Sequence, residues 1–265
     1  MTINSVVDGL RARKSVRKYK PDPVPDQTLE TILRAGQQAP FASQLYSVLR
    51  YKRKRAPFGA PVWLAVCADC HKLELFMKER GWEVRTNDLS LLLFAVQDAS
   101  YAAQNIVTAA ESLGLGSCFL GAVSMEPGRI RAVARDFKLP PRVLPVVELV
   151  LGYPDEDRPP RPRYPLDFAY FEGTYPELGP DRVRAAMRVM DEGYLAQDYY
   201  ARMKAKLPLE DGRPETFTYK DYSWTEHISR KWGQWAPDPS GMLEALAERG
   251  FHLGPGRDGP EPPTA

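Results

Sequence analysis

Apolar residues recur at helical spacing along several stretches of the chain and fill other, shorter stretches almost completely. The helical spacing predicts helices over 5–13, 26–39, 88–113 and 126–137. The mostly apolar runs predict strands over 48–52, 62–68 and 143–152, and a strand followed by a turn over 117–123. Because the helices and strands do not alternate regularly, this order favours an α+β fold.

The stretch 88–113 carries the strongest helical pattern of the chain. Alanines such as Ala99, Ala102 and Ala110 stand among larger apolar residues on several of its faces. Small residues let neighbouring elements approach closely, so we expect a core helix that is packed on all sides. Gly114 is the expected end of this helix.

The composition changes after a proline-rich loop at 153–165. Residues 180–250 are helix-like and carry aromatic clusters, and the chain ends in a stretch rich in Gly and Pro. We therefore expect three parts, which are a core over 1–179, a helical excursion over 180–254 and a flexible tail over 255–265.

Composition and charge exclude several classes of protein. The 265 residues are 43% hydrophobic and 26% charged, as in ordinary globular proteins. The chain holds 36 basic and 34 acidic residues, a balance that argues against a nucleic-acid binder. No apolar run approaches the roughly 18–20 residues of a membrane helix, and the first residues lack the apolar segment of a signal peptide. With only 3 cysteines, these features predict a cytoplasmic protein without membrane or nucleic-acid partners.

Two short motifs have more than one interpretation. Residues 67–71 spell Cys-x-x-Cys-His, the attachment sequence of c-type haem, which also contains a redox Cys-x-x-Cys. Coincidence is the favoured interpretation, because export is not predicted and a zinc site would have to draw on Cys118, His227 or His252. We therefore predict no metal site. The basic run 52–55 is either a solvated loop or a contact for phosphate or nucleic acid.

Arginines and a serine alternate near the N-terminus. Arg13, Ser15 and Arg17 project to one side if the chain is extended there. Two guanidinium groups and a hydroxyl on one side form a receptor for phosphate or carboxylate. Arg161 and Arg163 form a second such pair in a proline-stiffened loop, and both pairs could converge on one phosphate.

A resemblance gives these motifs a context. Residues 13–40 resemble the opening of the FMN-dependent nitroreductase family, whose members begin with an Arg-x-Ser-x-Arg phosphate and flavin motif. Residues 98–123 are similar to the family's central helix and flavin-contacting turn. Further similar stretches follow in the family's order. They are 144–154, 161–165, 190–204, 223–228 and 243–251. The last three resemble the branch of NADPH-dependent, oxygen-insensitive nitroreductases and flavin reductase P enzymes.

The resemblance implies both a fold and an activity. The fold would be α+β and nitroreductase-like, with a central, mainly antiparallel sheet flanked by helices, in an intertwined homodimer that holds FMN at its interface. The activity would be an oxidoreductase reaction that moves hydride from NADPH or NADH through FMN N5 to nitroaromatic, quinone or flavin acceptors by a ping-pong mechanism.

The segment 51–60 departs from the family pattern, because it is shorter and more basic than is usual. Two alternatives therefore stay open. One is a flavoenzyme of the same fold with another acceptor reaction, such as reductive dehalogenation or flavin fragmentation. The other is a non-catalytic module that binds flavin or a polyanion.

Residue by residue, the resemblance implies a flavin site that uses no catalytic side chain. The FMN phosphate and ribityl chain would be held by Arg13, Lys14, Ser15, Arg161 and Arg163. Arg17 would face flavin N1, where its charge would stabilise the reduced, anionic flavin. The pyrimidine edge of the flavin would contact Ala42, Ser43 and Gln44.

The isoalloxazine ring and the electron donor would have contacts of their own. The ring would lie along Phe119, Leu120, Gly121 and Ala122, with the Gly121 N–H near flavin N5. Core packing is the alternative for Phe119 and Leu120. Arg202 and Lys204 would bind NADPH, and a solvated helix end is the alternative for this pair. The polar insertion 203–222 is expected to be mobile enough to close over a ligand.

Overall fold

The computed structural model describes residues 4–52 and 54–253, and the contacts within it divide into two compact units. Unit 1 runs to Arg158 and resumes at Pro239, and unit 2 is the stretch between them. The predicted core, by contrast, extends to residue 179. Residues 239–253 belong to unit 1 by their contacts, although the sequence predicts them to be part of the helical excursion. The predicted tail 255–265 lies outside the described residues.

Unit 1 is built around one four-stranded sheet. The strands are β1 (Tyr46–Arg50), β2 (Val62–Asp69), β3 (Gly116–Leu120) and β4 (Val143–Gly152). Their order is β1-β2-β4-β3, and each neighbouring pair is antiparallel, which confirms the predicted sheet type. Every residue of β2 is buried, because this strand lies between β1 and β4, as its continuous apolar run predicts.

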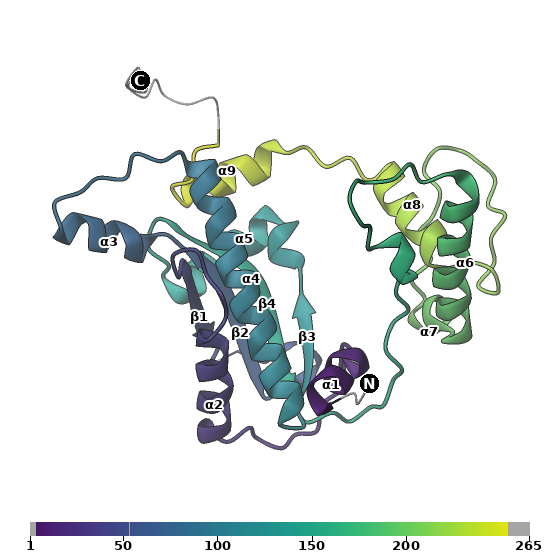
Figure 1. Ribbon diagram of the computed structural model, residues 1–265, viewed down its shortest axis with the longest axis horizontal. Helices are drawn as coiled ribbons and strands as arrows, with labels where there is room; N and C mark the ends of the chain where they lie inside the picture. The colour runs from purple at the N-terminus through teal and green to yellow at the C-terminus, as the bar shows by residue number, and fades with distance from the viewer. Residues whose placement is uncertain (1–3, 53, 254–265) are drawn as a thin grey trace. The chain divides into compact units, whose positions relative to one another are not determined.

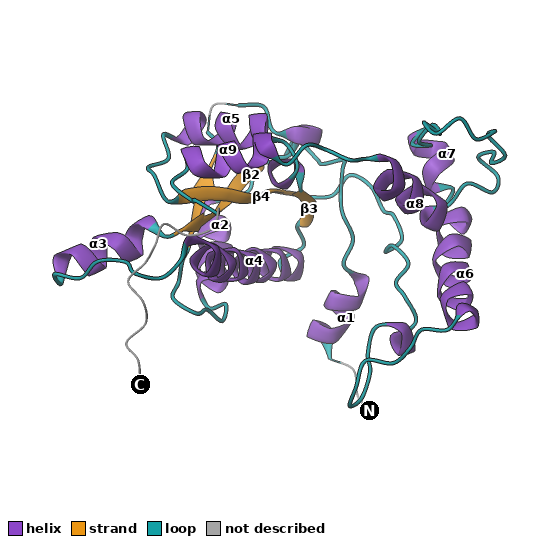
Figure 2. Ribbon diagram, turned by 90° about the horizontal axis from the view of Figure 1, so that it is seen from above, coloured by secondary structure: helices purple, strands orange, loops and turns teal. Residues whose placement is uncertain are grey.

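Helices cover both faces of this sheet, as Figure 2 shows. α4 (Asp88–Ser112) crosses one face and contacts all four strands, and α2 (Asp26–Gln37) packs against α4 (Figure 1). α5 (Pro127–Phe137) lies on the opposite face with α9 (Ser240–Glu248) beside it.

The contact between α2 and α4 depends on a glycine. A Cβ added at Gly36 of α2 would lie 2.5 Å from the Ile106 Cγ1 atom of α4. Only a residue without a side chain therefore allows the two helices to approach this closely. The turn that follows α2 is thereby held near α4, and this turn contains residues predicted to contact the flavin.

α4 is amphipathic in the single chain and is not packed on all sides, so that prediction from its alanine pattern was wrong. Ala95, Ala99 and Ala103 are fully or almost fully buried on the side that faces the sheet. Large apolar side chains on the helix remain 44–56% exposed. They are Leu89, Leu93, Phe94 and Tyr101. A single chain therefore presents a substantial apolar surface along α4.

The remaining helices are shorter than α4. In unit 1 they are α1 (Ser5–Ala12) and α3 (His71–Glu79), and α3 was not predicted from the sequence. Unit 2 contains α6 (Pro180–Ala196), α7 (Tyr199–Met203) and α8 (Trp224–Gln234), in line with its helix-like composition. Within the residues that the structure describes, no helix combines the length and the hydropathy that crossing a membrane requires.

Candidate functional site

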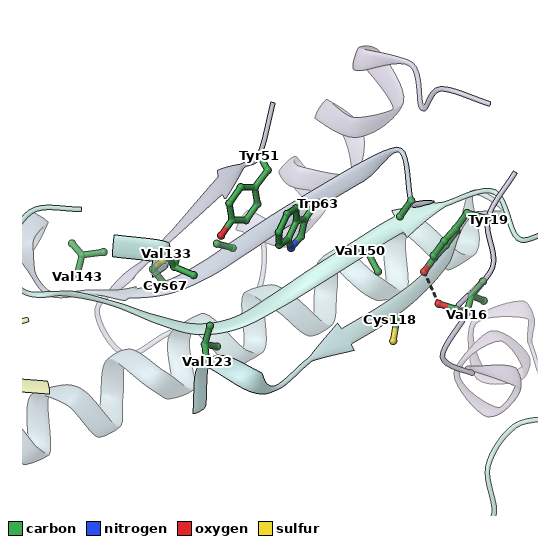
Figure 3. Close-up of a cluster of buried hydrophobic side chains, with 12 residues drawn as sticks. Val16, Tyr19, Tyr51, Trp63, Cys67, Cys118, Val123, Val133, Val143 and Val150 are labelled. Carbon is green, nitrogen blue, oxygen red and sulfur yellow. Dashed lines mark hydrogen bonds between the residues drawn. The ribbon is translucent and has the colours of Figure 1, made fainter. Parts of the chain in front are cut away.

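The segment 13–19 is extended and runs beside β3, at the edge of the sheet. Ser15 forms a parallel bridge with Ser117, and the Val16 N–H donates to the Ser117 carbonyl at 2.8 Å. Val16 is buried, and the Tyr19 hydroxyl donates to its carbonyl at 2.7 Å, as Figure 3 shows. In an extended segment successive side chains point to opposite sides, so its odd and even positions have different surroundings.

Asp155 and Asp157 engage the two lysines of this segment, and Glu156 accepts a hydrogen bond from the Arg17 backbone N–H at 2.6 Å. Lys14 forms an ion pair with Asp157, and Lys18 forms one with Asp155, each at 2.5 Å between Nζ and a carboxylate oxygen. The hydrogen bond from each lysine lowers the pKa of its aspartate. The Lys14 ammonium group is therefore engaged by Asp157, and its contact with FMN stays a prediction.

Arg13, Ser15 and Arg17 all lie close enough to Cys118 to act on its thiol. Burial raises the pKa of the Cys118 thiol, whereas Arg17, a hydrogen bond to Ser15 and Arg13 all act to lower it. In the described part of the chain, neither the Arg13 nor the Arg17 guanidinium forms an ion pair. Two guanidinium groups that no ion pair neutralises and one hydroxyl thus share one side of the segment.

The turn at 42–45 is organised by a residue that the sequence did not single out. Asp98 of α4 is only 1% exposed, and its carboxylate accepts hydrogen bonds from three backbone N–H groups of this turn. The donors are Ala42 at 2.7 Å, Ser43 at 3.1 Å and Leu45 at 2.9 Å. Gln44 adopts a left-handed conformation with φ of 54° within the same turn. Because the N–H groups of Ala42 and Ser43 are already bonded, their side chains and the exposed Gln44 are what this turn can offer a ligand.

A cavity of about 640 Å³ adjoins this turn. It lies between the end of α2, strand β1 and α3, and Ser43 and Gln44 form part of its wall. The wall also includes Gln37, Lys72 and Phe76, so it combines polar and apolar groups. Sites that bind planar, partly polar ring systems combine polar and apolar groups in this way.

The turn after β3 contains the other predicted flavin contacts. Phe119 packs against the apolar cluster on the α4 side of the sheet, and Leu120 packs against the cluster on the α5 side. Both side chains therefore contribute to the core of unit 1. Gly121 is exposed, and a Cβ built on it would meet nothing within 4 Å. Ala122 begins the 3-10 turn Ala122–Ser124.

A buried ion pair holds the base of this turn. Glu148 of β4 lies opposite Leu120 in the strand register and is 1% exposed. Its two carboxylate oxygens accept hydrogen bonds from Arg129 of α5, at 2.7 Å from Nε and 2.5 Å from Nη2. Bidentate pairing fixes the geometry of both groups, so β4 and α5 hold the two ends of the segment around Gly121.

The second arginine pair lies in unit 2. Arg161 Nη1 donates to the Gln197 Oε1 atom at 2.6 Å, and the guanidinium carbon lies 3.9 Å from the centre of the Tyr199 ring. Arg163 is exposed, and its Nη1 donates to the carbonyl groups of Arg161 and Pro162. The convergence of these arginines with Arg13 on one phosphate stays a prediction.

The predicted NADPH contacts lie at the end of α7. Arg202 and Lys204 are both exposed. Arg202 Nη1 donates to the Gln197 carbonyl at 2.9 Å, and Lys204 adopts φ of 50° just after the helix. Their role in binding NADPH stays a prediction.

The insertion 203–222 is bonded to α8 in the structure, and its expected mobility stays a prediction. Arg230 of α8 is 3% exposed, and its Nη1 donates to the Leu207 carbonyl at 2.7 Å. The same guanidinium makes a bidentate contact with Glu215, at 2.7 Å and 2.9 Å. One buried side chain thus anchors the insertion at two points.

Residues of both ambiguous motifs have contacts within unit 1. Cys67 and Cys70 are free and buried, and burial raises the pKa of both thiols to about 12, so few thiolates form at neutral pH. In the basic run, Arg53 lies outside the described residues, and Lys54 pairs with Asp136 at 2.6 Å. The adjoining Tyr51 is stacked on Trp63 with 3.8 Å between the ring centres (Figure 3).

Comparison with known proteins places this arrangement in a family. The model of the Nitroreductase family matches residues 10–55 and 49–153, which together span more than half of the chain. The chain belongs to the nitroreductase family.

Relatives with assigned names agree with this membership. The FMN reductase [NAD(P)H] of Bacillus subtilis (strain 168) is 30% identical over 207 residues, which cover 72% of this chain and 81% of the relative. The oxygen-insensitive NADPH nitroreductase of Salmonella typhimurium is 28% identical over 251 residues, covering 86% and 91% of the two chains. The structure of the hypothetical oxidoreductase YcnD from Bacillus subtilis superposes with a TM-score of 0.78 at 26% identity, covering 95% of this chain and 99% of YcnD.

The nitroreductase-family match covers only part of the predicted site. It contains the odd-numbered arginines of the N-terminal segment, the turn at 42–45 and the turn around Gly121. Arg161, Arg163 and Arg202 lie beyond it in unit 2. The assignment of these three residues therefore depends on their motifs and on the longer alignments to the named relatives.

Proposed function

We propose that this nitroreductase-family protein is an FMN-dependent oxidoreductase that uses NADPH or NADH to reduce a small-molecule acceptor. The proposed acceptors are nitroaromatics, quinones or free flavins. The names of two relatives, an FMN reductase and an NADPH nitroreductase, support this class of reaction.

The observation that carries the proposal is the separation of charges along residues 13–18. Asp155 and Asp157 neutralise the lysines, whereas neither Arg13 nor Arg17 forms an ion pair with any residue that the structure describes. FMN ends in a dianionic phosphate, for which guanidinium groups supply matched, charge-assisted donors. The donor set therefore fits this cofactor, and none of the predicted strands is followed by a dinucleotide-binding Gly-x-Gly-x-x-Gly sequence.

FMN, when bound, supplies the two-electron chemistry by which hydride passes from donor to acceptor. The residues of the chain bind it, orient it and adjust its charge. Arg17 would place a positive charge where the reduced flavin carries a negative one, and the Gly121 N–H would offer a fixed donor to the ring. The Asp98 carboxylate would hold the turn at 42–45 in place against the ring edge. The reaction requires little acid–base chemistry from side chains.

We further propose that the protein acts as a homodimer. The apolar side of α4, with Leu93 at 56% and Phe94 at 51% exposure, is too large a surface to leave in water in a typical monomer. Pairing of two such surfaces would bury it. It would also bring the two chains together beside the turn that Asp98 of the same helix holds.

The identity of the released cofactor tests the proposal. Protein purified from its expression host is heated, and the supernatant is examined by mass spectrometry. The proposal predicts FMN in near-equal amount to the protein. FAD as the released flavin, or no flavin even after reconstitution of the purified protein with FMN, would contradict it.

A further inference from the structure

Gln197 forms hydrogen bonds with two arginines that are predicted to bind different ligands. It follows α6 directly, and its side-chain Oε1 accepts a hydrogen bond from Arg161 Nη1 at 2.6 Å. Its backbone carbonyl accepts a second hydrogen bond from Arg202 Nη1 at 2.9 Å. Arg161 is the residue predicted for the FMN phosphate, and Arg202 is the residue predicted for NADPH. All three residues lie within unit 2.

Both the oxygen and the nitrogen of the Gln197 side-chain amide form hydrogen bonds, which fix its orientation. While Oε1 accepts from Arg161, Nε2 donates to the Pro160 carbonyl at 2.9 Å. Turning the amide over would direct a donor at the guanidinium and an acceptor at a carbonyl, so one orientation is strongly preferred. The side chain therefore holds the guanidinium of Arg161 and the backbone just before it.

Packing reinforces these hydrogen bonds. The Arg161 guanidinium stacks on Tyr199, with 3.9 Å between its carbon and the ring centre. Pro162 lies against Gly193 of α6, where an added Cβ would be 2.5 Å from the Pro162 Cγ atom. The loop and the end of α6 thus contact each other without an intervening side chain. The stacking on Tyr199 and the hydrogen bond to Gln197 together fix the plane of the Arg161 guanidinium.

We propose that Gln197 is a positioning residue that holds Arg161 ready for the FMN phosphate and connects it to the donor-binding Arg202. This inference rests on the proposed function. A neutral amide suits the task because it orients the guanidinium without itself adding a negative charge beside it. A carboxylate at the same place would orient Arg161 equally well but would compete with the phosphate for it.

The experiment uses Gln197→Glu and compares two flavins that differ only in the phosphate. Apoprotein is titrated with FMN and with riboflavin, and binding is followed by quenching of flavin fluorescence. For Gln197→Glu we expect the dissociation constant for FMN to rise about tenfold, while that for riboflavin stays within about twofold. Gln197→Met, which removes both hydrogen bonds without adding charge, should weaken FMN binding less and serves as the test variant if Gln197→Glu does not fold.

Gln27→Glu is the matched control, because it makes the same change of charge at an exposed position near the start of α2. It should leave the ratio of the two dissociation constants as in the wild type. If wild-type protein prefers FMN and both Gln197 variants keep that preference, the positioning role is refuted. Equal weakening of FMN and riboflavin would refute it too, because such a change reports general damage. If the wild type does not prefer FMN over riboflavin, the proposed phosphate site itself is refuted.

Discussion

The Asp98 carboxylate accepts a hydrogen bond of 2.7 Å from the Ala42 N–H, although 56 positions separate the two residues in the sequence. Asp98 stands on the buried side of α4, and Ala42 lies in the exposed turn after α2. This contact and the two neighbouring ones couple a rigid core helix to a turn that is predicted to contact the flavin. The conformation of the turn is thereby fixed before any ligand binds.

The first prediction concerns this carboxylate. Asp98→Asn replaces one acceptor oxygen by an NH₂ donor, so at least one buried N–H group of the turn loses its partner. Unfolding by urea should show a loss of about 1–3 kcal/mol in the free energy of unfolding, together with weaker FMN binding. Asp181→Asn changes a fully exposed carboxylate and should alter neither quantity. Unchanged stability and FMN affinity in Asp98→Asn would show that the turn does not depend on Asp98.

The second prediction compares the effects of Arg17 and Lys18 of the N-terminal segment on FMN binding. Arg17→Ala removes a guanidinium that no ion pair neutralises, and a charge-assisted hydrogen bond contributes about 1.5–3 kcal/mol. The dissociation constant for FMN should therefore rise roughly ten- to a hundredfold. Lys18→Ala, one position further along, removes a cation that is already paired with Asp155 and should change the constant little. Equal effects of the two changes on FMN titration of the apoprotein would contradict the proposed separation of charges.

Local patterns were sufficient to predict much of the sheet and of its covering helices. The strand predicted over 143–152 has these bounds in the structure, because β4 lies between β2 and β3, where its mostly apolar residues are covered. β1 begins two residues earlier than predicted, at Tyr46, since all five of its residues are half-buried and the apolar signal is weak there. The strand followed by a turn that is predicted over 117–123 is confirmed, because β3 ends at Leu120 and a 3-10 turn begins at Ala122.

The contacts that hold the candidate site could not be predicted in the same way. Asp98, Gln197 and Arg230 each act on partners in other elements, and nothing in their immediate neighbours in sequence reveals those partners. An aspartate in the middle of an alanine-rich helix was a signal that could have been followed, because a buried charge requires donors. Lys14 differs from Arg13 because it is paired with Asp157, which lies more than a hundred positions away in the sequence.

The third prediction concerns the assembly. Leu93→Glu places a charge in the apolar surface of α4, where burial in a dimer interface would desolvate it. Light scattering coupled to gel filtration should give the mass of a dimer for the wild type and that of a monomer for the variant. Leu243→Glu makes the same change at a residue on α9 that is 49% exposed, and the mass of a dimer is expected. A monomeric wild type, or a Leu93→Glu protein that stays dimeric, would refute the α4 interface.

The fourth prediction concerns the electron donor. Arg202→Glu replaces an attraction for the 2′-phosphate of NADPH by a repulsion, and NADH lacks this group. The Michaelis constant for NADPH should rise at least severalfold, whereas that for NADH should change little. Steady-state rates with both donors and one quinone acceptor measure this. Equal changes for the two donors, or none for either, would leave Arg202 as a structural residue that holds the Gln197 carbonyl.

The central claim is that the protein passes hydride from a nicotinamide to an acceptor through FMN in two separate half-reactions. The most direct test mixes FMN-loaded protein with one equivalent of NADPH without oxygen and then, after the donor is consumed, adds a quinone. The account predicts that the visible absorption of the flavin is lost in the first step, with either NADPH or NADH, and returns in the second step without further donor. Flavin that stays oxidised in the presence of both NADPH and NADH, or that is reduced but is not reoxidised by quinone, nitroaromatic or free flavin, would contradict it.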